Sequence, residues 1–314
     1  MSDQKIIAVV GATGAQGGGL ARAILAEPQG GFSLRALTRD PDSPKAKDLA
    51  QAGAEVQVAD LDDEAGLRAA FEAAHGVYLV TNYWADMSAE HEIAQAATAA
   101  RAAQATGISH LIWSTLEDTR AYLPLDDPGI PLFDGKYRVP HFDAKSEADR
   151  FFADARVPTT YLRPSMYWEA FSNFGFGPRR AEDGTLVLSL PMGDRKLAGI
   201  AAEDIGRTAL GIFKRGDEFI GSAVGIAGEH LTGDEFAAAF SDVYGEPVAY
   251  RPVTFDEFRA QDVPAAAEVG NMFQYYYLAE AEFTGSRDVA LVRTLNPQLQ
   301  SFRSWLRNHP VPTQ

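Results

Sequence analysis

Two side chains that can exchange a proton stand one helical turn apart near the middle of the chain. His141 and Lys145 lie four residues apart in a segment that is expected to open a helix running to about residue 155. A histidine titrates near neutrality, so either His141 or Lys145 is a candidate proton donor. Ser114, just past the predicted strand over 109–113, adds a hydroxyl. The alternative is that His141 packs or caps the helix and Ser114 is an ordinary strand-end hydroxyl.

Aromatic residues are concentrated in two segments that could form the wall of a pocket. The first choices are Tyr83, Trp84 and Tyr167, followed by Trp168, Phe171 and Phe174. Ligands bind beyond the carboxyl ends of parallel strands, and Tyr83 and Trp84 follow a predicted strand. Aromatic faces suit flat apolar molecules such as quinones, polycyclic ketones or cyclic imines. The competing interpretation is that most of these rings form the core of a second domain.

The elements that position these groups begin with a glycine-rich turn. Gly11, Gly14 and Gly17 stand at three-residue spacing between a predicted strand over 6–10 and a predicted helix over 20–26. The first glycine allows a tight turn, the second lets the backbone approach a pyrophosphate, and the third lets the helix pack on the strand. The helix N-terminus offers free N–H groups to an anion. The pattern predicts a dinucleotide-binding unit rather than a plain turn.

The second predicted strand, over 33–37, ends near Arg39. In sites specific for NAD an acid at this place bonds the ribose hydroxyls, whereas an arginine suits the 2′-phosphate of NADP. Lys45 and Lys47 are second candidates, and all three cations could instead be solvated surface charges.

The third predicted strand, over 55–59, ends in Asp60, Leu61 and Asp62. Segments at this place border adenine, so Asp60 and Leu61 are candidate cofactor residues, although Asp60 could also cap a helix. Asp62 is expected to cap the helix predicted over 64–74.

A periodic succession of strands and helices runs to Pro164 and then stops. The fold class is therefore α/β, with a doubly wound parallel sheet and a smaller C-terminal α+β part. We expect a nucleotide-binding domain over residues 1–164. Residues 165–314 are expected to form mainly a substrate or partner domain, with segments returning to the sheet. Residues 118–140 are interpreted as a loop over the site, and the alanine-rich helix over 88–106 as packing on the sheet or on a second subunit.

Composition excludes several classes of protein. The 314 residues contain no cysteine, which excludes disulfides, thiolate metal sites and cysteine nucleophiles. The net charge of −15 argues against direct binding of nucleic acid. We expect no membrane span and no signal peptide, hence a cytoplasmic protein. Outside His141, no histidine pairs with carboxylates at metal-ligand spacing, so no metal site is predicted.

A set of motifs distributed over nearly the whole chain resembles the NmrA-like family of atypical short-chain dehydrogenase/reductase proteins. The motifs are Gly-Ala-Thr-Gly-Ala-Gln-Gly-Gly (11–18), Val-Thr-Asn-Tyr-Trp (80–84), His-Phe-Asp-Ala-Lys (141–145), Leu-Ser-Leu-Pro-Met-Gly-Asp (188–194) and Asn-Met-Phe (271–273). The set is particularly similar to the NADPH-sensing branch of that family. The resemblance implies a Rossmann domain, a small C-terminal domain and a cleft that prefers NADP(H). It places at the cofactor the residues Gly11, Thr13, Gly14, Ala15, Gln16, Gly17, Arg39, Thr81, Asn82 and Lys145.

The resemblance leaves two hypotheses for function. Ordinary short-chain reductases use a Tyr-x-x-x-Lys pair, and here His141 stands in the tyrosine position. The first hypothesis is an NADPH-dependent reductase of a small hydrophobic carbonyl, quinone or imine. The second is a non-catalytic NADPH sensor that regulates a protein partner, with the segment 118–140 as its switch. A homodimer is compatible with both.

Overall fold

A seven-stranded sheet organises the first half of the molecule. The computed structural model describes residues 4–262 and 265–313. All neighbouring strands of this sheet are parallel, in the order β11-β6-β5-β4-β1-β2-β3. The strands are β1 (Lys5–Val10), β2 (Phe32–Thr38), β3 (Glu55–Val58), β4 (Gly76–Leu79), β5 (His110–Ser114), β6 (Thr159–Arg163) and β11 (Ala223–Gly225). The strand order reverses between β1 and β4, which is the topological switch point of a Rossmann-type fold.

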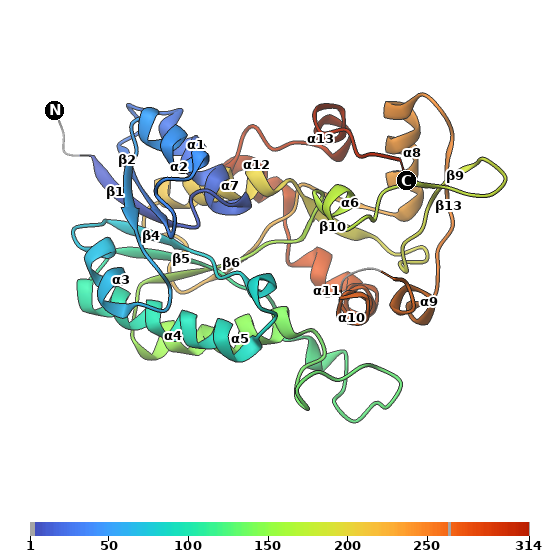
Figure 1. Ribbon diagram of the computed structural model, residues 1–314, viewed down its shortest axis with the longest axis horizontal. Coiled ribbons are helices and arrows are strands. Elements are labelled where there is room, and N and C mark those ends of the chain that lie inside the picture. The colour runs from blue at the N-terminus through green and yellow to red at the C-terminus, as the bar shows by residue number, and fades with distance from the viewer. Residues whose placement is uncertain (1–3, 263–264, 314) are drawn as a thin grey trace.

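Helices cover both faces of the sheet (Figure 1). One face carries α1 (Ala15–Leu25), α2 (Pro44–Gln51), α7 (Ala202–Lys214) and α12 (Val289–Leu295), and the other carries α3 (Glu64–Phe71), α4 (Ala89–Thr106) and α5 (Pro140–Asp154). Alternate residues of β1 supply the two cores: Ile7 and Val9 face the first group of helices, and Ala8 and Val10 face the second. Both sides of the strand are apolar because both faces are covered.

Helix α1 begins within the glycine loop, at Ala15 rather than at the predicted Leu20. Two of the intervening helical positions require glycine because neighbouring backbone leaves no room for a side chain. A Cβ on Gly17 would lie 2.4 Å from the Gly11 carbonyl oxygen. On the opposite side, a Cβ on Gly19 would lie 2.6 Å from the Glu203 carbonyl oxygen, and one on Gly206 would lie 2.0 Å from the Leu20 nitrogen. Helices α1 and α7 therefore pack backbone against backbone.

The second half of the molecule has its own core, built largely from aromatic rings. It contains two three-stranded sheets: β7 (Met166–Tyr167), β10 (Leu197–Ile200) and β12 (Glu229–Leu231), and β8 (Arg179–Arg180), β9 (Leu186–Leu188) and β13 (Val248–Tyr250). The helices are α6 (Ala170–Asn173), α8 (Gly233–Tyr244), α9 (Phe255–Arg259), α10 (Ala266–Leu278), α11 (Glu280–Gly285) and α13 (Phe302–Asn308). Thr232 and Thr254 cap α8 and α9, each in a capping box. None of the helices in the described residues is both long and apolar enough to span a membrane.

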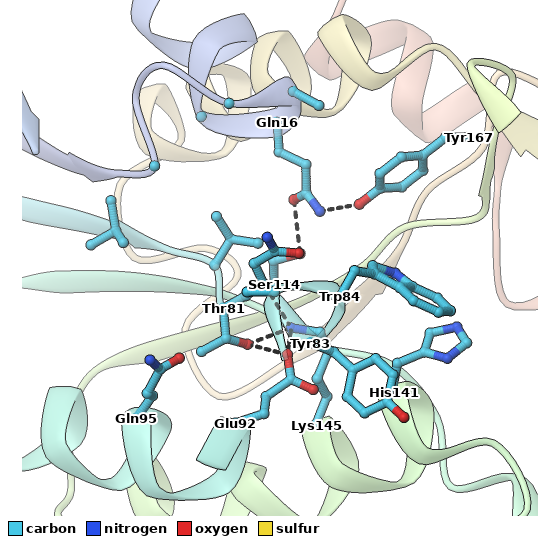
Figure 2. A pocket seen from close by; sticks show the side chains of 18 of the residues that line it. Gln16, Thr81, Tyr83, Trp84, Glu92, Gln95, Ser114, His141, Lys145 and Tyr167 are labelled. Atoms are coloured by element: carbon cyan, nitrogen blue, oxygen red, sulfur yellow. Dashed lines mark hydrogen bonds and ion pairs between the residues drawn. The ribbon is translucent and has the colours of Figure 1, made fainter. Parts of the chain in front are cut away.

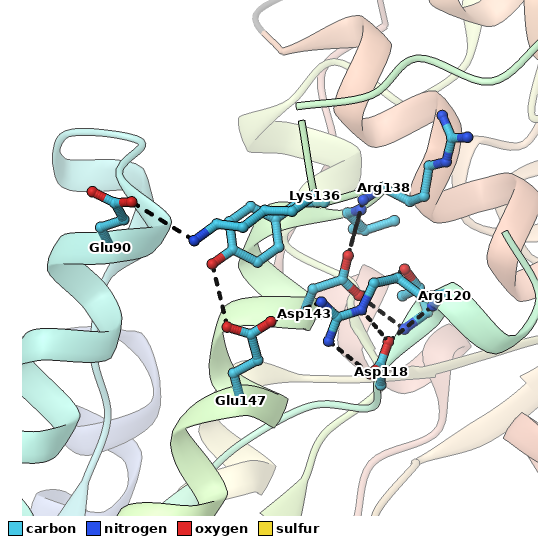
Figure 3. Close-up of polar contacts among 10 residues, drawn as sticks. Glu90, Asp118, Arg120, Lys136, Arg138, Asp143 and Glu147 are labelled. Atoms are coloured by element: carbon cyan, nitrogen blue, oxygen red, sulfur yellow. Dashed lines mark hydrogen bonds and ion pairs between the residues drawn. The ribbon is translucent and has the colours of Figure 1, made fainter. Parts of the chain in front are cut away.

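Polar contacts fix the segment 118–140 against the molecule (Figure 3), and none of its residues lines the cavity described below. Its anchor is Asp143, which is buried in the first turns of α5 and accepts hydrogen bonds from the Thr119 N–H and hydroxyl and from the N–H groups of Arg138 and Val139. The Arg138 guanidinium is also buried and donates to the carbonyl oxygens of Pro124, Asp127 and Ile130. The prediction of a loop over the site is wrong because these buried partners hold the segment to one side.

Candidate functional site

One cavity of about 950 Å³ opens at the carboxyl ends of the central strands. It extends from the glycine loop after β1, past the ends of β2, β4 and β5, to helix α10 of the second half. Figure 2 shows side chains from both halves of the chain pointing into it. The cavity lies where a doubly wound sheet binds its ligand.

The glycine loop forms a cradle for an anion at one side of this cavity. Gly11, Thr13, Gly14, Ala15, Gln16 and Gly17 all line the cavity. Gly11 has φ of +67°, a conformation that a side chain would strain. Helix α1 has no side-chain cap and no acidic residue in its first turn. Its first N–H groups and its dipole are therefore available to a pyrophosphate.

Arg39 lines the cavity just beyond β2, with an exposed side chain. Among the described residues it makes no ion pair, whereas its neighbour Asp40 accepts a hydrogen bond from the Asp42 N–H within its own loop. The two lysines that were second candidates differ. Lys45 donates to the Thr13 carbonyl oxygen at 3.5 Å, beside the glycine loop, whereas Lys47 pairs with Asp42 at 3.3 Å. Arg39, with Lys45 nearby, is placed to meet a phosphate.

The adenine side of the predicted site is lined by Asp60, Leu61 and Asp62. The prediction that Asp62 caps the following helix is wrong. Helix α3 begins at Glu64, so the cap position falls to Asp63, whose carboxylate accepts from the Ala65 N–H. Asp62 instead bonds the His91 Nε2 at 2.8 Å. Hydrogen bonds with Asp86 and then Asp62 raise the pKa of His91 and tie the loops after β3 and β4 together.

Gln16 is the centre of a buried polar network at the floor of the cavity. Its side-chain oxygen accepts from the Ser114 hydroxyl at 2.8 Å and from the Tyr78 hydroxyl, and its nitrogen donates to the Tyr167 hydroxyl. Burial raises the pKa of both Tyr78 and Tyr167, so these phenols stay protonated. The network joins the glycine loop to β4, β5 and β7.

Lys145 projects from α5 into the cavity and meets Thr81 (Figure 2). Its ammonium donates to the Thr81 hydroxyl at 2.6 Å and lies 3.0 Å from the Glu92 carboxylate of α4. The Thr81 hydroxyl donates in turn to Glu92 at 2.6 Å, and the Trp113 ring lies 4.9 Å from the ammonium. All of these groups are buried, so Lys145 is held by charge, hydrogen bonds and an aromatic face.

His141 lies one turn before Lys145, and the two side chains have different partners. Its ring nitrogen Nδ1 is hydrogen-bonded to the Glu268 carboxylate of α10, which also accepts from the His141 backbone N–H at 3.3 Å. The second Glu268 oxygen accepts from the Tyr83 hydroxyl at 3.0 Å. Burial, with Glu268 adding to it, raises the pKa of Tyr83, which therefore donates this bond. The Trp84 ring lies over His141, with ring centroids 4.9 Å apart.

The aromatic residues predicted for the substrate pocket divide into two groups. Tyr83, Trp84, Tyr167 and Phe174 line the cavity, and Trp84 is exposed at its mouth. Trp168 and Phe171 do not line it, so their assignment to the pocket is wrong. Successive residues of extended chain point to opposite sides, so Trp168 turns away from the cavity where Tyr167 enters it. Trp168 packs on Phe302 and Trp305, and Phe171 packs on Phe236, Phe240 and Phe302, inside the second core.

Several residues at the cavity are not predicted from the sequence. The buried carboxylates Glu92 and Glu268 are the most important, and their partners come from other elements. The cavity is further lined by Ser165, Phe176, Met272 and Tyr276. Ser165 follows β6, so the strand-end argument applied to Tyr83 could have found it. Its buried hydroxyl has no hydrogen-bond partner in the described part of the chain.

These groups fit a dinucleotide with a small apolar molecule beside it. The glycine cradle and Arg39 can receive phosphates, and the unpartnered Ser165 hydroxyl and the Lys145 ammonium can bond polar groups of a ligand. Thr81 and Asn82 line the same stretch. No cluster of three or more His, Asp or Glu side chains suited to a metal ion occurs within residues 4–262 and 265–313.

Known proteins that resemble this chain in sequence or in fold include oxidoreductases and a transcriptional regulator. The chain is 29% identical over 293 residues to an NmrA-like family domain-containing oxidoreductase, FrzB, of Cladobotryum sp, with 86% of this chain and 83% of that protein covered. Its fold resembles that of NmrA, a negative transcriptional regulator, in complex with NADP. The TM-score is 0.77 and the identity is 24%, with 99% of this chain and 96% of that chain covered. The fold also resembles that of the Citrobacter sp. triphenylmethane reductase complexed with NADP(H). Here the TM-score is 0.74 and the identity is 20%, with 96% of this chain and 99% of that chain covered. The model of the NmrA-like family matches residues 3–284, and the chain therefore belongs to the NmrA-like family.

Proposed function

We propose that this protein is an NADPH-dependent reductase of a small, flat, hydrophobic carbonyl, quinone or imine. The observation that carries the proposal is the single cavity that joins the glycine cradle and Arg39 to His141 and an aromatic wall. The family relatives named as oxidoreductases support the reaction class. The NADP(H) complexes among the similar structures support the cofactor.

The chain's own residues hold the cofactor at three places. The cradle of Gly11 to Gly17 binds the pyrophosphate through backbone N–H groups, and Arg39 pairs with the 2′-phosphate. Lys145, fixed by Thr81 and Glu92, bonds the ribose beside the nicotinamide. When bound, NADPH supplies a hydride. The chain then has to present the acceptor in a dry site and deliver a proton.

The acceptor lies against aromatic rings and receives its proton from His141. Trp84, Tyr167, Phe174 and Tyr276 line the apolar part of the cavity, and such faces favour flat conjugated molecules over flexible polar ones. His141 stands where a tyrosine would serve in an ordinary short-chain reductase, and its Nε2 makes no hydrogen bond to any residue that the structure describes. That nitrogen is free to bond an acceptor.

The reaction is tested by measuring NADPH consumption with quinones, aromatic ketones and cyclic imines. We expect turnover of at least one class, and we expect it to disappear in a Lys145→Met/Glu92→Gln variant, which removes the buried ion pair as a unit. Lys47→Ala is a matched control, because Lys47 pairs with Asp42 outside the cavity. Tight NADPH binding with no consumption across the panel would contradict the reductase and favour the non-catalytic sensor. Because residues 118–140 do not line the cavity, a sensor would need another switch.

The cofactor preference depends on Arg39. We expect Arg39→Ala to weaken the binding of NADPH by about 10- to 150-fold, which corresponds to the loss of one charge-assisted hydrogen bond of about 1.5–3 kcal/mol. The affinity for NADH, which has no 2′-phosphate, should change little. Isothermal titration of both nucleotides measures the ratio, with Lys47→Ala again as the control cation. An equal loss of affinity for the two nucleotides would contradict the assignment of Arg39 to the 2′-phosphate.

A further inference from the structure

We infer that Glu268, from the C-terminal half of the chain, is the positioning residue that makes His141 a proton donor. The inference rests on the proposed reductase function and assigns a role to a residue that lies outside every recognised motif. Glu268 is 2% exposed and His141 is 7% exposed, so water does little to stabilise charge on either side chain.

The geometry fixes which nitrogen of His141 faces the acceptor. Nδ1 bonds the Glu268 carboxylate, and that bond selects the form of the ring with a proton on Nδ1. The same carboxylate oxygen accepts from the His141 backbone N–H, so the carboxylate binds both the ring and the start of α5. The ring is further held by contacts with Trp84, at a tilt of 47°, and with Phe142, in a T-shaped arrangement, with ring centroids 4.9 and 5.0 Å away. Nε2 is therefore the nitrogen that is left for the cavity.

The surroundings of Glu268 direct its carboxylate at His141. Three donors converge on its two oxygens: the Nδ1–H and backbone N–H of His141, and the Tyr83 hydroxyl. Hydrogen bonds to a carboxylate favour its charged form, and a buried anion favours a cation beside it. Among the described residues Glu268 has an ion-pair contact with His141, and Lys145, one turn further along α5, is paired with Glu92. The negative charge of Glu268 is thus directed at the His141 ring, which is the group that gains stability when it is doubly protonated.

The hydride and the proton go to different atoms of a carbonyl acceptor. The carbonyl carbon of an acceptor gains the hydride that NADPH supplies, and the C=O π electrons move to the oxygen. His141 gives the proton on Nε2 to that oxygen and becomes a neutral ring with its remaining proton on Nδ1, still bonded to Glu268. Solvent later returns a proton to Nε2. An iminium cation that accepts a hydride becomes a neutral amine and needs no proton, so Glu268 should matter for a carbonyl and not for an iminium.

The experiment compares Glu268→Gln with wild type on an aromatic ketone and on a cyclic iminium salt. Glutamine has the same shape and can still accept from Nδ1, but it has no charge. We expect ketone turnover to fall by about 100-fold or more, the size of a general-acid contribution, with KM nearly constant and iminium turnover changed by less than about threefold. Glu280→Gln, the same change on an acid of α11 that pairs with Arg195, should leave both reactions unchanged.

A second readout needs neither cofactor nor substrate. In protein labelled with ¹⁵N-histidine, the ring nitrogens of His141, assigned by their loss in His141→Gln, report which of them carry protons. At one fixed pH near neutrality we expect a smaller doubly protonated fraction and a less deshielded Nδ1 proton in Glu268→Gln than in wild type. Unchanged ring signals, or equal loss of ketone and iminium turnover, would overturn the inference. Absence of turnover in the wild type would remove the proposed function, while the ring signals would still test the coupling.

Discussion

Replacing Lys145 by methionine is expected to lower the free energy of unfolding by about 3–5 kcal/mol, as when one partner of a buried ion pair is removed. Methionine keeps most of the apolar stem but leaves Glu92 charged, 2% exposed and without a cation. One Glu92 oxygen already has no hydrogen-bond partner among the described residues, so the carboxylate would retain little besides the Thr81 hydroxyl. Equilibrium unfolding in urea measures the loss as a shift of the midpoint at constant slope.

The matched control is Lys145→Met/Glu92→Gln, which removes the charge along with its partner. We expect this double variant to regain most of the lost stability, because a neutral buried amide costs far less than an unpaired carboxylate. It should nevertheless remain inactive with NADPH, since the ammonium is gone. A single variant as stable as wild type would show that Lys145 does not neutralise Glu92. The comparison also separates a folding role of Lys145 from a cofactor role, which Lys145→Ala alone would confuse.

Asp143→Ala is the second large change, because it removes the acceptor for four buried donors at once. These donors are the N–H and hydroxyl of Thr119 and the N–H groups of Arg138 and Val139. Each unsatisfied buried donor costs about 1–3 kcal/mol, so we expect a loss of at least about 3 kcal/mol. We also expect release of the segment 118–140, seen as faster tryptic cleavage after Arg120 and Lys136.

Asp143→Asn serves as the graded control for this prediction. Its amide keeps one oxygen for Thr119 but turns an N–H₂ group toward the Arg138 and Val139 donors, so both stability and protection should be intermediate. Wild-type cleavage rates in Asp143→Ala would mean that other contacts suffice, such as the bonds from the Asn271 amide to the Pro131 and Arg138 carbonyl oxygens. Either result measures how firmly the segment is held beside the site.

The nucleotide-binding half was predictable from the sequence because its signals are local. An apolar run rich in β-branched residues marks β1, and the glycine spacing marks the loop that follows it. The parallel-strand rule places Arg39, Thr81 and Tyr83 at one edge. The start of α1 was missed because glycine is normally a poor helix residue. Here the close backbone of Gly11 and Glu203 requires it.

The substrate side was less predictable because it depends on contacts between distant elements. Nothing near Glu268 in the sequence indicates His141, which is 127 residues away. Trp168 was wrongly assigned to the pocket because successive side chains of an extended chain point to opposite sides. A difference of one residue therefore decides whether a side chain enters the pocket or the core. The irregular composition of 118–140 correctly indicates a loop, but only the buried Asp143 and Arg138 reveal that it is anchored.

The backbone contact between α1 and α7 also bears on how the polypeptide is made. The glycine loop and α1 leave the ribosome well before two of their partners in the fold: the helix that fits against Gly19 begins at Ala202, and strand β11 spans Ala223–Gly225. Val292 and Leu295 of α12 complete the same apolar layer. Contacts so distant in sequence form slowly. The nascent nucleotide-binding half therefore cannot complete its sheet and helix layer until α12 has been translated, and until then the unpaired edge of β6 is exposed to aggregation.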